Sequence, residues 1–163
     1  MMKVFYLIVV FITMLIWPLP AMGDGNEAGI SGILYSIHYE NGTVLNVTED
    51  SKNFYELNSS TTKFLENIAY RMERDVTRGV LEKELVGTKY LVVISDKPMK
   101  IQTKPGLNPD WPQGWEIVTK KIVIKLQKEV LGEERIFTYH EPEDVGAPIR
   151  PWASLASVNT IIL

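Results

Sequence analysis

Three asparagines between residues 41 and 60 stand in the Asn-x-Ser/Thr pattern of N-glycosylation acceptors. The triplets begin at Asn41, Asn46 and Asn58, and none has proline in the middle. The chemistry would be attachment of a glycan to the side-chain amide, which happens only in proteins that enter the secretory pathway. Chance alone would give about one such triplet in a chain of this composition. Three therefore favour glycosylation, provided that the chain is secreted from a eukaryotic cell.

The front of the chain has the three parts of a secretory signal peptide. One basic residue, Lys3, precedes an uncharged apolar run from residue 4 to residue 17. Two prolines then end any helix, and small residues precede a cleavage site that we expect between Gly23 and Asp24. The alternative is a membrane anchor, but the run is shorter than the roughly 20 residues that a spanning helix needs. The sequence therefore predicts a signal peptide over residues 1–23.

The remaining residues, 24–163, have the size of one secreted domain. The chain has no cysteine, which excludes disulfides, thiol nucleophiles and zinc–thiolate sites. Its 17 Lys and Arg and 20 Asp and Glu form no block of like charge, so we expect no nucleic-acid partner. No long apolar stretch follows the signal peptide, so we also expect no stable membrane span after its removal.

Groups that could perform catalysis show no recognisable pattern. The chain lacks a nucleophile elbow, a Gly-rich phosphate loop and a paired-histidine metalloprotease motif. The segment 140–144 places a histidine among acids, but it lacks the spacing and the glycine turn of a calcium loop. A solvated loop is the simpler interpretation. The sequence thus predicts a non-enzymatic protein with no cofactor and no metal.

The best candidate for recognition is the segment DWPQGW, residues 110–115. Trp111 and Trp115 flank Pro112 and Gly114, which constrain the loop. Two tryptophans on such a loop could anchor an interface, because tryptophan gives a large contact area at a low entropy cost. Alternatively, both fold back and close one end of the core. The sequence leaves both interpretations open.

The elements that would position these residues are mainly strands. Alternating or continuous apolar patterns predict strands over 30–39, 44–48, 88–95, 99–103, 116–131 and 135–140, and a last one over 158–163. The Asn41-Gly42 pair predicts a hairpin between the first two, whereas residues 141–151 are typical of a loop.

A single helix is predicted after capping candidates in residues 59–62. Its apolar positions at helical spacing are Phe64, Leu65, Ile68, Met72 and Val76. The expected fold is α+β, with one amphipathic helix packed on an antiparallel sheet of about five to seven strands.

The stretch KELVGTKYLVVI, residues 83–94, is similar to the first inhibitory hairpin of cystatins, where a Q-x-V-x-G loop leads into a strand. Gly87 matches the glycine of that loop. Lys83 stands at the glutamine position and Leu85 at the valine position. The order of helix, loop and strand is also that of cystatins.

A second match lies near the end of the chain, where Pro151 and Trp152 resemble the Pro-Trp of the second cystatin hairpin. The interval from Gly87 to this pair is longer than in cystatins. The resemblance covers roughly residues 60–163, and it implies a cystatin-like fold and inhibition of cysteine proteases. The segment 83–87 and the Pro-Trp pair would then form two parts of a wedge that enters the protease cleft.

Three functions follow from these features. The first is a secreted, extracellular N-glycoprotein that acts through protein–protein contacts, in a matrix or as a secretion component, with an extracellular protein as its partner. The second is a cystatin-type inhibitor, whose partner would be a cysteine protease. The third is a carrier in which the helix closes the sheet over a small apolar ligand. The first hypothesis accounts for the signal peptide, the glycosylation triplets and the missing catalytic groups together.

Overall fold

The computed structural model describes one unit of the chain. The chain divides into Met1–Ile30 and Ser31–Leu163, and every described residue belongs to the second unit. The described stretches are 32–72, 74–126, 136–139 and 148–163.

Three sequence-based predictions fall outside these residues: the signal peptide, its cleavage site between Gly23 and Asp24, and the acidic segment 140–144. Among the helices of the described stretches, none has the length and apolar character needed to cross a membrane.

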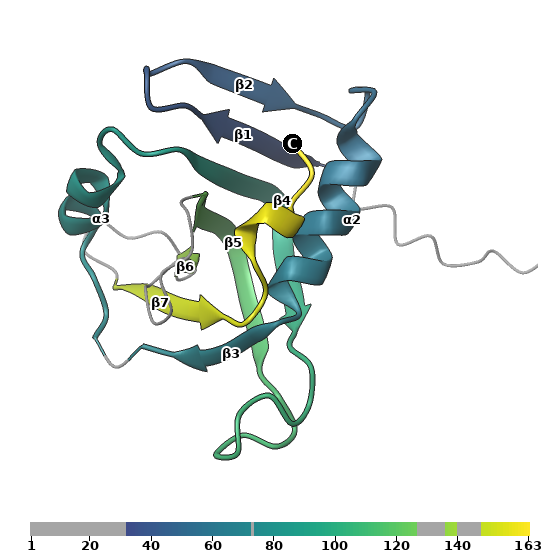
Figure 1. Ribbon diagram of the computed structural model, residues 1–163, viewed down its shortest axis with the longest axis vertical. Coiled ribbons are helices and arrows are strands. Elements are labelled where there is room, and N and C mark those ends of the chain that lie inside the picture. Colours follow the sequence, from purple (N-terminus) through teal and green to yellow (C-terminus); the bar gives the residue numbers. More distant parts are fainter. Residues whose placement is uncertain (1–31, 73, 127–135, 140–147) are drawn as a thin grey trace, which may run out of the picture. The chain divides into compact units, whose positions relative to one another are not determined.

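Within the described residues, seven antiparallel strands form one sheet in the order β2-β1-β4-β5-β6-β7-β3 (Figure 1). The strands are β1 (Ile33–His38), β2 (Val44–Val47), β3 (Ile68–Arg71), β4 (Tyr90–Gln102), β5 (Glu116–Lys125), β6 (Ile136–Tyr139) and β7 (Ile149–Ser154). Two α-helices, α2 (Phe54–Leu65) and α3 (Arg78–Leu85), and the 3-10 turn η1 (Val158–Thr160) complete this part of the chain. The predicted α+β class is confirmed.

The β1–β2 hairpin forms where the sequence predicts it. Gly42 takes a positive φ of 83° at the turn, and the Tyr39 amide donates to the carbonyl of Thr43. The two strands predicted over 88–95 and 99–103 are instead one long strand, β4, with a register shift between Ile94 and Met99. Pro98 lies in this shift, where its missing amide hydrogen removes no ladder bond.

The helix predicted over residues 64 to 76 is wrong in position. Helix α2 ends at Leu65, and the edge strand β3 begins at Ile68. The apolar spacing misleads because its members belong to different layers. Phe64 and Ile68 are buried in the cluster under α2, whereas Val76 packs into the cluster on the other face of the sheet.

Two further elements differ from the sequence-based expectation near the end of the chain. Strand β7 begins within the residues 141–151 that were expected in a loop, and it lies between β6 and β3 in the sheet. The strand predicted over 158–163 is wrong: the segment begins with the 3-10 turn η1. Val158 of this turn and Ile161 directly after it are buried in the cluster under α2. The Ile162 amide donates to Ser60 Oγ of that helix at 3.0 Å.

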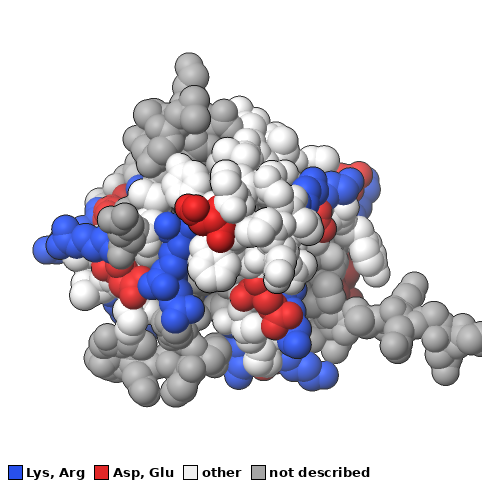
Figure 2. Space-filling model, turned by 90° about the horizontal axis from the view of Figure 1, so that it is seen from below, with Lys and Arg blue, Asp and Glu red and all other residues white. Residues whose placement is uncertain are grey.

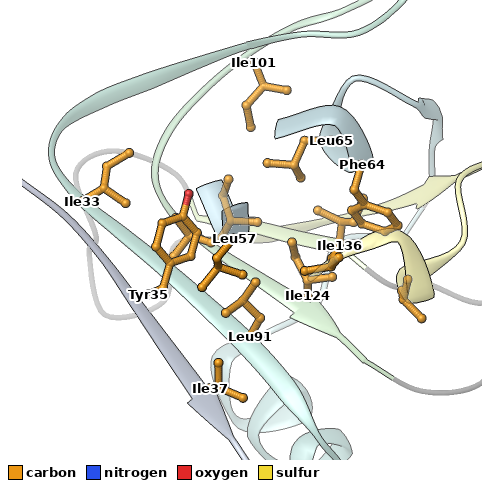
Figure 3. Packing of buried hydrophobic residues seen from close by; sticks show 14 of the residues in the cluster. Ile33, Tyr35, Ile37, Leu57, Phe64, Leu65, Leu91, Ile101, Ile124 and Ile136 are labelled. Carbon is orange, nitrogen blue, oxygen red and sulfur yellow. The ribbon is translucent and has the colours of Figure 1, made fainter. Parts of the chain in front are cut away.

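The two faces of the sheet carry separate cores, since side chains alternate between the faces along each strand. Leu91 and Val93 of β4 face α2, and Val92 between them faces α3. Figure 3 shows the larger core, in which Leu57 and Phe64 of α2 meet side chains from the strands. On the opposite face, Leu81 of α3 is the helical residue that is almost completely buried.

Candidate functional site

Three tryptophans pack in a row at one end of the sheet, on the face that carries α2. The rings of Trp111 and Trp115 have centroids 4.3 Å apart, and the Trp115 ring meets Trp152 edge to face at 5.5 Å. The row runs from the surface to the core: Trp111 is 50% exposed, whereas Trp152 of β7 is 3% exposed. An exposed ring is thereby fixed through two others to the sheet.

The loop between β4 and β5 holds the first two rings in place. The Thr103 amide donates to the carbonyl of Trp115 at 3.0 Å, and Thr103 Oγ1 accepts from the Trp115 amide at 2.7 Å. Gly114 is required here, because its φ is +79° and a Cβ at this position would lie 2.6 Å from the Thr103 carbonyl oxygen. At the base of the loop, the Lys104 amide donates to the carbonyl of Glu66.

Two adjoining hollows lie beside the tryptophan row and share Arg71 and Trp115 as lining residues. The inner hollow, of about 160 Å³, reaches Arg150 and Trp152. The outer hollow, of about 370 Å³, is lined further by Tyr70, Met72, Asn108, Asp110 and Trp111. We call the two together the tryptophan cleft. Figure 2 looks at the end of the domain with the β4–β5 loop, where uncharged surface is flanked by basic and acidic groups.

Two arginines, Arg71 and Arg150, and two acids, Asp110 and Glu116, line the cleft. Arg71 Nη2 lies 2.7 Å from Asp75 Oδ1. Burial lowers the pKa of Arg150, the positive charge of Arg71 lowers it further, and Asp75 raises it. The two guanidinium groups lie close together because Arg71 is paired with Trp152 and Arg150 is two residues before Trp152. All three side chains therefore share one face of the sheet.

Two buried hydrogen-bond donors of cleft residues find no acceptor among the described residues: Trp115 Nε1 and Arg150 Nε. In contrast, Trp152 Nε1 donates to Thr138 Oγ1 at 2.8 Å. Most buried polar groups in folded proteins have a partner. The wall of the cleft therefore has hydrogen-bonding capacity that the described residues leave unused.

The strand β5 adds backbone groups to the same wall. It pairs with β4 along its whole length down to Glu116, but its pairing with β6 covers only Ile122 to Ile124. Glu116, Ile117 and Val118 line the inner hollow, and the described residues provide no ladder partner for them on that side.

Each of the two interpretations of the aromatic loop applies to one of its tryptophans. Trp115 folds back onto the core, as the closing alternative predicts, and Trp111 stays half exposed above it. Arg71 and Arg150 carry no signal in the sequence. They reach the cleft only because β3 and β7, which are far apart along the chain, are neighbours in the sheet.

The segments that resemble the two cystatin hairpins lie in different elements, the first in helix α3 and the turn after it and the second in strand β7. Lys83 and Leu85 belong to helix α3, and Gly87 follows at a positive φ of 70° before β4 begins. Leu85 packs with the α3 cluster. Pro151 and Trp152 lie inside strand β7, where both are buried, and Trp152 joins the α2 cluster. The structure does not bring the two segments into one exposed wedge.

The three glycosylation triplets occupy different environments. Asn41 is exposed at the hairpin turn, where its Oδ1 accepts from the Thr43 amide. Asn46 is exposed on β2. Asn58 is half-buried within α2, and its Oδ1 accepts from the hydroxyl of Tyr35 at 2.6 Å.

Searched across the described stretches, the structure holds no group of three or more His, Cys, Asp or Glu side chains arranged for a metal ion. Comparison of the chain with models of known protein families, with curated proteins and with solved structures gave no match.

Proposed function

We propose that the protein is a secreted, non-enzymatic N-glycoprotein that acts by contact, and that it binds an extended segment of an extracellular protein in the tryptophan cleft. The observation that supports this proposal most is the position of Trp111. Its ring is half exposed, yet it is held by Trp115, which is itself held by the buried Trp152.

A ring fixed in this way is suited to be an interface anchor. Side chains that are ordered before binding lose little conformational entropy on association, and tryptophan and arginine are the residues most enriched among those that dominate binding energy. The cleft supplies both types, together with Tyr70.

The inner hollow adds a reason to favour a polypeptide segment. The stretch from Glu116 to Val118 offers backbone groups, and the orphan donors Trp115 Nε1 and Arg150 Nε would be satisfied by carbonyl or carboxylate oxygens. An extended segment provides a regular row of backbone groups and alternating side chains, of which one set would reach the hollow.

The test uses the intact secreted glycoprotein and a phage-displayed library of random peptides. We expect selected peptides to share a motif and to bind the Trp111→Ala variant at least tenfold more weakly, which corresponds to the loss of about 1.4 kcal/mol. The matched control is Tyr55→Ala, which removes an aromatic ring that is 76% exposed on α2 and should leave affinity unchanged. Equal affinity for both variants would place the binding surface elsewhere.

The cystatin-type inhibitor is a separate proposal that rests on the resemblance of residues 83–94. It predicts inhibition of papain-like proteases that is lost when Gly87 is replaced by a bulky residue. A Cβ at Gly87 would meet no atom within 4 Å, so loss of inhibition would come from the altered loop rather than from a clash. Inhibition that survives the replacement would remove this candidate.

A further inference from the structure

Among the strands that the structure describes, β2 lies at an edge of the sheet and carries exposed apolar side chains. It stands first in the strand order, so only β1 pairs with it among the described residues. Val44 is 47% exposed and Leu45 is 45% exposed. An uncharged edge strand of this kind is a ready template for pairing with another strand. Within Val44–Val47 there is no lysine, no proline and no acidic residue that would discourage it.

The polar residue within this strand is Asn46, the asparagine of the second glycosylation triplet. Asn46 stands opposite Ser36 and Val44 opposite His38. Residues two apart on a strand point to the same side, so Asn46 and Val44 share one face of the edge. Leu45 and Val47 share the other face, on which Val47 is buried under α2.

The side chain of Asn46 reaches the neighbouring strand β1. Its Oδ1 accepts a hydrogen bond from Ser36 Oγ at 2.8 Å, which fixes the amide through its oxygen. The nitrogen Nδ2, to which a glycan is attached, is not used in that bond, and the residue is exposed. A glycan here would project from the face of the sheet that Asn46 shares with Val44.

We propose that Asn46 carries an N-glycan whose role is to cover the β2 edge, and that without it two copies of the chain associate by antiparallel β2–β2 pairing. A glycan on Asn46 would project from one face of the sheet at the middle of β2, where its bulk would collide with the side chains of a second strand paired to that edge. A two-fold antiparallel pair is self-complementary and would bury Leu45 of both copies. The proposal shares secretion with the proposed function, but it does not depend on the tryptophan cleft.

The first triplet provides a matched control. Asn41 lies at the hairpin turn, three residues before Val44, where β2 begins. A glycan there would extend beyond the strand end rather than over the middle of the strand. Removal of the Asn41 glycan should therefore leave the edge covered.

The experiment compares full-length chains secreted from a eukaryotic cell line, by peptide mass mapping and sedimentation velocity. We expect Asn46 to be modified and the wild type and Asn41→Gln to sediment as monomers. Asn46→Gln and, independently, Thr48→Ala, which removes the triplet but keeps Asn46, should sediment as dimers of twice the mass. Adding Leu45→Lys to Asn46→Gln should restore the monomer, because a charged side chain on the edge opposes pairing.

The outcomes separate this inference from the proposed function. If Asn46 is unmodified in the wild type while Asn41 is modified, no glycan covers the β2 edge and the inference is overturned, whereas secretion of the protein is supported. If both triplet-removing variants stay monomeric at the concentrations at which the wild type is studied, the edge does not pair and the inference is overturned. Peptide binding in the cleft would be unaffected by either result.

Discussion

The helices on the two faces of the sheet cover hydrophobic clusters of very different size. On one face, α2 and the residues around η1 join a cluster of nineteen buried side chains among the described residues. On the other, α3 covers a cluster of five. Helix α3 has eight residues, a glycine in its first turn and no side-chain hydrogen bond at its N-cap, Thr77. The comparison indicates that the α2 face determines global stability and that α3 opens more easily as a local unit.

The largest expected effect is a difference between two large-to-small substitutions, one on each face. Phe64→Ala removes a fully buried ring under α2 and should lower the free energy of unfolding by about 3–5 kcal/mol. Leu81→Ala on α3 should cost about 2 kcal/mol, the lower end for leucine, because a short helix can move to fill the space. Urea unfolding followed by circular dichroism measures both.

Hydrogen exchange shows which elements each of the two substitutions destabilises. Amides of α3 should lose protection in Leu81→Ala while those of β4 and β5 keep it, because α3 detaches alone. A Leu81→Ala variant as unstable as Phe64→Ala, with protection lost throughout, would show that the two faces form a single cooperative core.

A smaller effect is expected from a tyrosine buried on the α2 face. Burial raises the pKa of the Tyr35 hydroxyl above its ordinary value near 10. As the pH rises, the Tyr35 hydroxyl therefore loses its proton in the unfolded chain before it does so in the folded protein. The contribution of Tyr35 to the free energy of unfolding is complete below about pH 10 and falls as the pH rises further. The free energy of unfolding should therefore decline above pH 10 more steeply in the wild type than in Tyr35→Phe. Parallel declines would contradict it.

At neutral pH the same substitution tests one hydrogen bond. Tyr35→Phe removes the donor to Asn58 Oδ1 and should cost about 1 kcal/mol. An unchanged unfolding free energy would mean that water replaces the tyrosine hydroxyl at no cost.

The smallest effect is expected on the α3 face, from His38. Its ring stacks on Tyr90 with centroids 4.4 Å apart, and burial lowers its pKa below the ordinary value near 6.5. The unfolded chain then binds a proton more readily, so this contribution is present above about pH 6.5 and is lost as the pH falls. His38→Gln should flatten the pH dependence of stability between pH 7 and pH 5. An identical slope in the variant would show that the stacked ring titrates freely.

The strands were largely predictable because period-two alternation is a local property of the sequence. Residues 33 to 38 and 116 to 125 show it plainly, and both are strands. Helix α2 was missed over most of its length since FYELNSSTTKFL is rich in serine, threonine and asparagine, which have low helix propensity. Packing against the sheet stabilises it in spite of its composition, with even Ser60 and Thr61 buried.

Of the residues in the tryptophan cleft, only the two loop tryptophans could be predicted from the sequence. Trp111 and Trp115 are conspicuous in a loop with three prolines, and the structure places both in the cleft. Arg71 lies within the segment that was assigned to a helix, and Arg150 within one assigned to a loop. Their meeting depends on the pairing of β3 with β7, a long-range register that no local pattern specifies.

That pairing sets an order for folding during synthesis. Asn67, next to β3, accepts a hydrogen bond from Ser154 of β7, 87 residues further along the chain. At roughly 5–20 residues per second, β7 leaves the ribosome about 4–17 s after β3. The β1–β2 hairpin needs no such delay. Ile68 and Ala69, which end almost fully buried, are therefore available to chaperones throughout that interval, and slow codons between the two strands would lengthen it.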